Sequence, residues 1–359
     1  MDTKENVAST NIQAELNRLW DTQPGSSKAK ACLFNLIIYT QETCRSDYFK
    51  DMVRMIIEQF PCRIIFIQGD RSTHDSYLRV HVSAETGKDK RGMACDQILI
   101  EAAGKDLSRV PYLILPLFIP GLPIYLLWGE DPTTENTVLP HLQKFATRLI
   151  FDSECTEDLQ HFSQIMQQKL NSSSIQVVDM NWARIGGWRE ILAQTFDSKE
   201  RLAQLASVQY VKIIYNDLHS PFFRHPDTQA IYLQAWLASR LGWKFIKSEK
   251  KENTLVLNYQ GQQDPIQIDL VADTRTDLLP EDIIAAEVSN QKNYICNLMR
   301  QGNNQVVVHA SNQYQCELPF TLWLPTIRSG RSFMQEIFYQ KVSDHYSEML
   351  NLISKTKWS

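Results

Sequence analysis

Residues 31–39 read ACLFNLIIY and residues 62–67 read CRIIFI, and these two apolar runs enclose a helical pattern. Apolar side chains recur at helical spacing between them, at Tyr48, Met52, Met55, Ile56 and Phe60. Pro61 ends that pattern. A strand, a helix and a strand with short connections form a right-handed βαβ unit, because parallel strands need a crossover. The stretch therefore predicts a Rossmann-like α/β domain with a mostly parallel sheet.

Four further segments are expected to extend this sheet. Residues 77–83 and 97–101 alternate polar and apolar side chains, which predicts a hairpin-like pair at its margin. Residues 124–128 and 148–151 are short apolar runs and complete about six strands.

A domain boundary is expected where the sequence becomes small and polar, at residues 171–174. A helix over 157–170 precedes it and is expected to cover a face of the first sheet. We therefore predict two domains, residues 1–174 and residues 175–359.

The second domain is predicted to be α+β, with helices over 182–196 and 227–241. Its strands are expected at residues 254–259, 266–271, 283–288, 293–299 and 305–309. Most of them are spaced as hairpins, which predicts an antiparallel sheet. A long C-terminal helix from Arg331 to about Lys355 is expected, with Ser332 and Gln335 as a capping box.

Composition excludes several classes of protein. The chain has 359 residues and a formal net charge of −4, so the basic footprint of a nucleic-acid-binding protein is missing. The first ten residues have no apolar stretch and do not form a signal peptide. The most apolar segment, residues 111–128, holds four prolines, which argues against a membrane helix. We expect a cytoplasmic protein.

The seven cysteines are widely spaced and form no CxxC motif. Buried thiols in a reducing cytosol are the simplest interpretation. A redox-sensing pair that is distant in sequence stays open as the alternative.

Motifs for standard catalytic chemistry are missing from the sequence. Residues 40–46, after the first expected strand, contain no glycine. Without glycine the backbone cannot come close enough to bind a pyrophosphate. The chain has no Walker A loop, no HExxH and no GxSxG. We therefore expect no catalytic residues, no cofactor and no metal. Acidic side chains at Asp269, Asp273, Glu281 and Asp282 are interpreted as a surface hairpin, with paired carboxylates as the alternative.

Tryptophan and arginine recur together in the two expected helices of the second domain. In the first helix, taken as continuous through Gly186 and Gly187, helical angles place Arg189 between Trp182 and Phe196. In the second, Arg240 falls beside Trp236. An arginine among aromatic side chains must stack or find a carboxylate. An internal brace, a partner-facing patch and an anion pocket all stay open.

These segments resemble a known family. Residues 179–197, DMNWARIGGWREILAQTFD, resemble the signature D-L-N-W-x-R-L-x-x-W-R-E-L-L-A-x-x-F-D of the glucose-6-phosphate dehydrogenase assembly protein OpcA. Residues 235–243, AWLASRLGW, are similar to its second signature, and residues 115–128 to a third. The chain departs from the family pattern at Gly121, Gly129 and the pair 186–187.

The resemblance implies a non-catalytic protein that promotes assembly or activity of the glucose-6-phosphate dehydrogenase oligomer. The alternatives are a regulatory sugar-phosphate- or nucleotide-binding module and an enzyme with an unrecognised site. The signature side chains are the candidates for partner binding: Trp182, Arg184, Trp188, Arg189, Glu190, Trp236, Arg240 and Trp243. Among them we expect Trp236 to be core and Arg184 to be an exposed partner contact.

Overall fold

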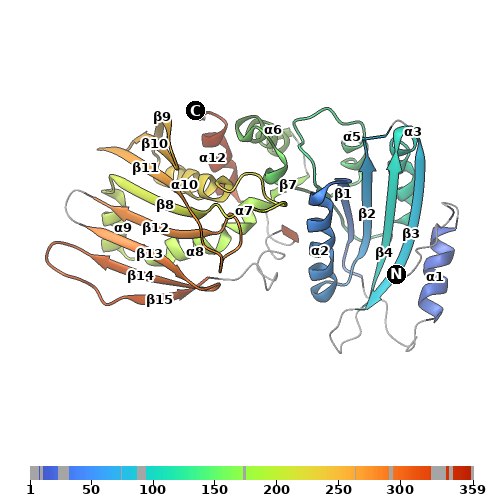
Figure 1. The fold of residues 1–359 in the computed structure, drawn as a ribbon, viewed down its shortest axis with the longest axis horizontal. Helices are drawn as coiled ribbons and strands as arrows, with labels where there is room; N and C mark the ends of the chain where they lie inside the picture. Colours follow the sequence, from blue (N-terminus) through green and yellow to red (C-terminus); the bar gives the residue numbers. More distant parts are fainter. Residues whose placement is uncertain are drawn as a thin grey trace. The chain divides into compact units, whose positions relative to one another are not determined.

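The computed structural model describes residues 8, 11–22, 32–73, 75–86, 94–172, 175–262, 264–290, 294–324, 337–338 and 343–356. They belong to two compact units, residues 1–156 with 173–178, and residues 157–172 with 179–359. Figure 1 labels the elements of both units. Each unit has its own sheet.

The first unit carries a seven-stranded sheet in the order β3-β4-β2-β1-β5-β6-β7. Its strands are β1 (Asn35–Gln41), β2 (Arg63–Asp70), β3 (Tyr77–Thr86), β4 (Ala94–Ala103), β5 (Ile124–Trp128), β6 (Arg148–Phe151) and β7 (Gln176–Asp179). β1 pairs in parallel with β2 and β5, β2 with β4, and β5 with β6. At the margin of the sheet, β3 pairs with β4 in antiparallel fashion. The Rossmann-like sheet and its marginal hairpin are confirmed.

Helices of the first unit pack on strands that are buried on both faces. The elements are α1 (Ile12–Thr22), α2 (Cys44–Gln59), α3 (Gly104–Leu107), α4 (Val110–Ile114), η1 (Leu115–Leu117), α5 (Leu139–Leu142) and η2 (Ser153–Cys155). β1 and β2 are almost completely buried, as parallel strands between helices must be. Helix α2 lies against β1 and buries Phe49, Met52 and Ile56.

The apolar, proline-rich segment over residues 111–128 is divided among α4, η1 and β5. Within the part of the chain that the structure describes, no helix has the length and apolar character needed to cross a bilayer.

The second unit carries an eight-stranded sheet in the order β15-β14-β13-β12-β8-β11-β10-β9. Its strands are β8 (Tyr210–Asn216), β9 (Lys244–Lys251), β10 (Thr254–Gln260), β11 (Pro265–Asp273), β12 (Ile283–Ser289), β13 (Ile295–Gln301), β14 (Gln305–Ser311) and β15 (Phe320–Trp323). All neighbours are antiparallel except β8 and β11, which run parallel. The predicted antiparallel sheet is therefore confirmed except at the parallel pair of β8 and β11.

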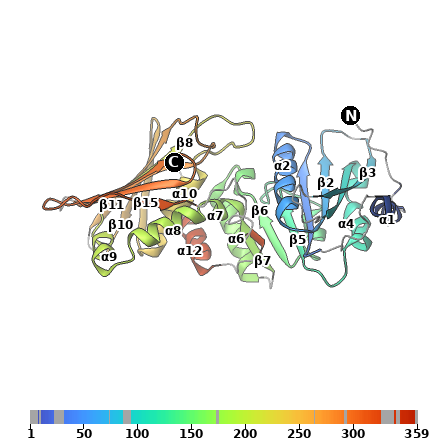
Figure 2. The same ribbon diagram turned by 90° about the horizontal axis from the view of Figure 1, so that it is seen from below.

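Helices cover one face of this second sheet (Figure 2). The helices of this unit are α6 (Leu159–Ser172), α7 (Met180–Arg184), α8 (Gly186–Thr195), α9 (Lys199–Ala206), α10 (Thr228–Arg240) and α12 (Asp344–Ile353). Helix α10 contacts β8 and β11 directly, α12 packs on α10, and α6 packs on α12. The strands show the alternation that a one-sided core requires, because β13 buries Cys296 and Leu298 while Ile295 and Met299 are exposed.

Two expectations about the domain boundary need correction. Helix α6 was expected to cover the first sheet, but it belongs to the second unit. Its side chains Gln160 and Gln164 both donate to the carbonyl oxygen of Ser354, just after α12. Strand β7 follows the predicted boundary at 174 and still completes the first sheet. The chain therefore enters the second unit with α6, returns to the first sheet with β7, and stays in the second unit from residue 179 onward.

The long C-terminal helix is also corrected. Ser343 is extended, with φ −81° and ψ 140°, and its hydroxyl accepts a hydrogen bond from the backbone N–H of His345. That geometry is a helix N-cap, so α12 begins at Asp344 and no continuous helix can run through this residue. The expected start at Ser332 and Gln335 lies outside the described residues.

Candidate functional site

The first signature segment (residues 179–197) forms two short helices. Ile185 separates α7 from α8 with φ −80° and ψ 0°, so the helix expected to be continuous is interrupted just before Gly186. Across this break, the Arg189 guanidinium carbon lies 3.5 Å from the centroid of the Trp182 ring. Arg189 also donates to the carbonyl oxygen of Trp182 at 3.2 Å. The expected Trp182–Arg189 pair is confirmed, and it links the two helices.

The indoles of this segment belong to the core of the second unit. Trp182 is 4% exposed and its ring centroid lies 5.4 Å from that of Tyr346 on α12. Trp188 is 3% exposed. Glu190, in contrast, is exposed and accepts a hydrogen bond from Gln194 one turn later.

Asp179 links the first signature segment to α10, the helix in which the second signature segment begins. Its carboxylate caps α7 by accepting the backbone N–H of Asn181 at 2.7 Å. The other carboxylate oxygen accepts the hydroxyl of Tyr232, on α10, at 2.7 Å. Helix α7 of the first segment therefore packs against α10.

Arg184 was expected at the surface, and this expectation is wrong. Its side chain is only 3% exposed, and a guanidinium nitrogen lies 4.0 Å from a carboxylate oxygen of the fully buried Glu281. The same guanidinium donates to Asn181 at 2.7 Å and lies 5.3 Å from the ring centroid of Phe223. Since a buried charge needs a counter-charge, Arg184 is part of an internal brace.

The two acidic residues of the turn directly before β12, Glu281 and Asp282, are buried and do not belong to a surface hairpin. Glu281 has 0% exposure and Asp282 has 5%. Gln229 of α10 donates to Glu281 at 3.2 Å, and Asp282 forms an ion pair with Arg300 at 2.9 Å. Glu281 has a φ of 69°, a left-handed conformation that costs free energy for a residue with a Cβ.

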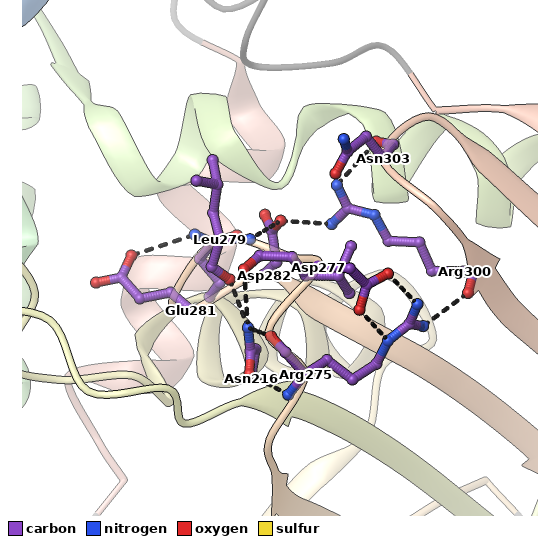
Figure 3. A network of polar contacts seen from close by, with 10 residues as sticks. Asn216, Arg275, Asp277, Leu279, Glu281, Asp282, Arg300 and Asn303 are labelled. Carbon is purple, nitrogen blue, oxygen red and sulfur yellow. Dashed lines mark hydrogen bonds and ion pairs between the residues drawn. The ribbon is translucent and has the colours of Figure 1, made fainter.

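Figure 3 shows how Asn216 holds this turn in place. Its side-chain amide donates to the carbonyl oxygens of Arg275 and Leu279, at 2.9 Å each. Its side-chain oxygen accepts the backbone N–H of Arg275, and its backbone carbonyl accepts that of Glu281. Asp269 and Asp273 do not join this turn, because Asp269 accepts the Tyr210 hydroxyl and Asp273 is exposed.

The second signature segment (residues 235–243) is less buried than expected. Trp236 is half-buried, so the expectation that it is core is wrong. Arg240 is exposed and pairs with Glu348 of α12 at 3.2 Å, not with an aromatic neighbour. Trp243 is 6% exposed and lies 6.4 Å from the Tyr259 ring.

The carboxyl edge of the first sheet is packed with side chains. In open α/β sheets, ligands bind where the strand order reverses, here between β1 and β5. A Cβ on Gly129, just after β5, would lie 2.4 Å from the Phe49 ring. Tyr39 and Trp128 stack at 4.2 Å, and Arg45 forms an ion pair with Asp152. These side chains pack against one another beside the point where the strand order reverses.

Glu130 is a second buried carboxylate at this edge, besides Asp152. It pairs with Arg71 at 3.1 Å and accepts the amide of Asn136 at 3.1 Å. Burial nevertheless raises the pKa of the Glu130 carboxyl above its ordinary value, and the nearby Arg71 charge only partly offsets this.

Among the described residues, no three His, Cys, Asp or Glu side chains come together as a metal site. Cys62, Cys95 and Cys296 are buried thiols, and Cys316 is exposed beside His309 at 3.0 Å. The backbone N–H of Cys62 lies 3.3 Å from the Cys95 sulfur.

Together, these features define a Rossmann-like protein of two units, with a packed carboxyl edge of the sheet in one and Trp–Arg and buried Arg–Glu pairs in the other. The chain belongs to the OpcA family: it matches the "Glucose-6-phosphate dehydrogenase subunit N-terminal domain" over residues 53–168 and the corresponding "C-terminal domain" over residues 175–316.

Curated relatives carry the name OxPP cycle protein OpcA. The protein from Synechococcus elongatus is 27% identical over 195 residues, which cover 53% of this chain and 42% of that protein. The one from Nostoc punctiforme is 29% identical over 198 residues, covering 53% and 40%. The matched part therefore spans about two fifths of the length of these relatives.

A solved structure shares the fold over most of the chain. The super-repressor mutant of Gal80p from Saccharomyces cerevisiae is similar with a TM-score of 0.55 at 8% identity, covering 90% of this chain and 95% of that one. At that identity the likeness shows the fold alone.

Proposed function

We propose that this chain is a non-catalytic assembly factor that binds the glucose-6-phosphate dehydrogenase oligomer in the cytoplasm and favours its active state. The observation that carries the proposal is the match to two domains named for a glucose-6-phosphate dehydrogenase subunit, in order along the chain. To activate the dehydrogenase, the chain must bind its active state more tightly than its inactive state.

The packed carboxyl edge of the first sheet supports a non-catalytic role. Phe49 of α2 lies directly against Gly129, so the chain's own side chains fill this part of the edge. The buried charges of the second unit also support this role, because Arg184 and Glu281 face one another within the chain.

Within the signatures, we propose that the exposed side chains carry the partner contact. These are Glu190 and Arg240, with the half-buried Arg189 next to Glu190 and the half-buried Trp236 one helical turn before Arg240. Trp182, Arg184, Trp188 and Trp243 are buried and would act by holding these helices in place.

The test is to co-purify the chain with the dehydrogenase of the same organism and to measure NADPH formation with and without it. We expect complex formation and a faster rate with the chain, and no NADPH from the chain alone with glucose 6-phosphate and NADP. A rate that does not change on saturating addition would contradict activation. Tight binding of glucose 6-phosphate or NADP to the isolated chain would support a regulatory ligand-binding module instead.

A further inference from the structure

The two edges of the eight-stranded sheet differ in charge. The β9 edge, residues 244–251, reads KFIKSEKK and carries four lysines. The β15 edge, residues 320–323, reads FTLW and carries no charge. Lysine on an edge strand is a common means of preventing edge-to-edge pairing. The sheet is protected in this way at β9 and not at β15. Figure 1 shows these two strands at opposite edges of the sheet.

The free backbone groups of β15 can be assigned from its pairing with β14. Leu324 donates its N–H to the carbonyl oxygen of Asn304 at 2.9 Å, and the register places Leu322 opposite Val306. In an antiparallel ladder, alternate residues direct both backbone groups to the same neighbour. Phe320 and Leu322 therefore bond to β14, and the N–H and C=O of Thr321 and Trp323 point to the free edge.

The side chains around this edge resemble the centre of a protein interface. Trp323 is 67% exposed, and Tyr314 and Leu318 in the connection before β15 are 89% and 90% exposed. On the face of β13 and β14 away from the helices, Met299 lies opposite Val307, and no residue of that face is Lys, Arg, Asp or Glu. Interface centres are depleted in charge and enriched in aromatic residues and methionine.

We propose that β15 pairs in antiparallel fashion with β15 of a second copy of this chain, joining the two sheets across a two-fold axis. An antiparallel edge is its own complement under such an axis, and the contact closes at two copies. Since β15 has no charge, no like charges oppose one another. The inference does not depend on the proposed binding of a dehydrogenase.

The register of this pairing follows from the outward backbone groups. With Leu322 on the axis, each Thr321 lies opposite Trp323 of the second copy, and both residues offer outward N–H and C=O groups. This register makes four backbone hydrogen bonds and two pairs of an aromatic with a β-branched side chain. With Thr321 on the axis, only two bonds form. The register centred on Leu322 is therefore the favoured one.

Sedimentation velocity of the full chain at rising concentration tests the proposal. We expect a monomer–dimer equilibrium that Thr321→Pro weakens by at least about tenfold, because proline removes an outward N–H without removing a bond to β14. Thr321→Val keeps the N–H and should keep the dimer. Ile246→Lys on the β9 edge, where Ile246 is 55% exposed, is the matched control and should change nothing.

Cross-linking checks the register. In a Cys316→Ser background, Leu322→Cys places two thiols across a non-hydrogen-bonded pair, with Cα atoms about 4.5 Å apart, within disulfide range. Phe320→Cys on the same strand would hold its two thiols about 13 Å apart and should not cross-link.

A chain that stays monomeric at high micromolar concentration overturns the proposal. So does a dimer that Thr321→Pro leaves intact. Loss of dehydrogenase binding in Thr321→Pro, without any dimer in the parent chain, would assign the edge to that partner instead.

Discussion

Arg184 and Arg240 lie in related signature segments, but solvent reaches only one of them. Arg184→Ala leaves Glu281 buried without this cationic neighbour, and such a change typically costs about 3–5 kcal/mol. Arg240→Ala removes an ion pair whose side chains are 43% and 50% exposed, and should cost less than about 1 kcal/mol. Urea denaturation of both variants measures the difference.

A charge-neutral double variant is the control for this comparison. Arg184→Met with Glu281→Gln removes both charges together and should recover much of the loss. Equal destabilisation by Arg184→Ala and Arg240→Ala would show that Arg184 does not compensate the buried carboxylate.

Glu130 makes a pH-dependent contribution to stability whose sign follows from its raised pKa. Because burial raises the pKa of this carboxyl in the folded state, the stability it contributes is fully present below the unfolded pKa. That stability is lost as pH rises through the folded pKa. Glu130→Gln does not ionise, so its free energy of unfolding should increase relative to the parent chain as pH rises through this window. A difference that is flat with pH, in urea titrations across mildly acidic pH, would rule this out.

At the scale of elements, the end of α10 depends on a left-handed glycine. Gly242 has a φ of 68°, and the N–H of Trp243 bonds back to the carbonyl oxygen of Ala238 at 2.9 Å. A Cβ there would meet no atom within 4 Å. Gly242→Ala should therefore lower the free energy of unfolding only by the cost of the left-handed backbone conformation, about 1 kcal/mol. Gly242→Asn should cost less, because asparagine tolerates this conformation. Thermal unfolding that ranks alanine at or above glycine would contradict this account.

Some strong local patterns predicted elements well, but β8 was missed although its sequence, YVKIIYN, is typical of a strand. Ile124–Trp128 was predicted with its observed bounds, because a short apolar run after a proline has few other solutions. Strand β9 was missed, because its lysines mask any strand pattern. Strand β15 was missed because it has only four residues. The extended backbone at Ser343 interrupts an otherwise helical pattern, which spacing alone does not reveal.

The candidate site, like the fold, could be predicted from the sequence only in part. Helical angles placed Arg189 beside Trp182, although the helix breaks between them. The burial of Arg184 could not be predicted, because Glu281 comes from a turn far along the chain. The sequence did contain a sign that Glu281 is buried. Residues 279–282, LPED, directly precede the apolar strand β12, so their acidic side chains enter the core with it.

At the scale of the whole molecule, each unit has its own sheet and its own buried thiols. Cys62 and Cys95 belong to the first unit and Cys296 to the second. Burial raises the pKa of the Cys62 thiol, and it raises the pKa of Cys296 to about 11. Alkylation needs the thiolate, so these thiols should react only after their own unit opens.

We expect the two units to unfold separately, because each is compact around its own core. Brief alkylation at rising urea, read by peptide mass spectrometry, should show Cys62 and Cys95 becoming reactive together and Cys296 at a different urea concentration. Cys316 is exposed and should react without urea, which confirms that the reagent is active. A single midpoint for all three buried thiols would show instead that the chain unfolds as one cooperative unit, with its stability shared between both sheets.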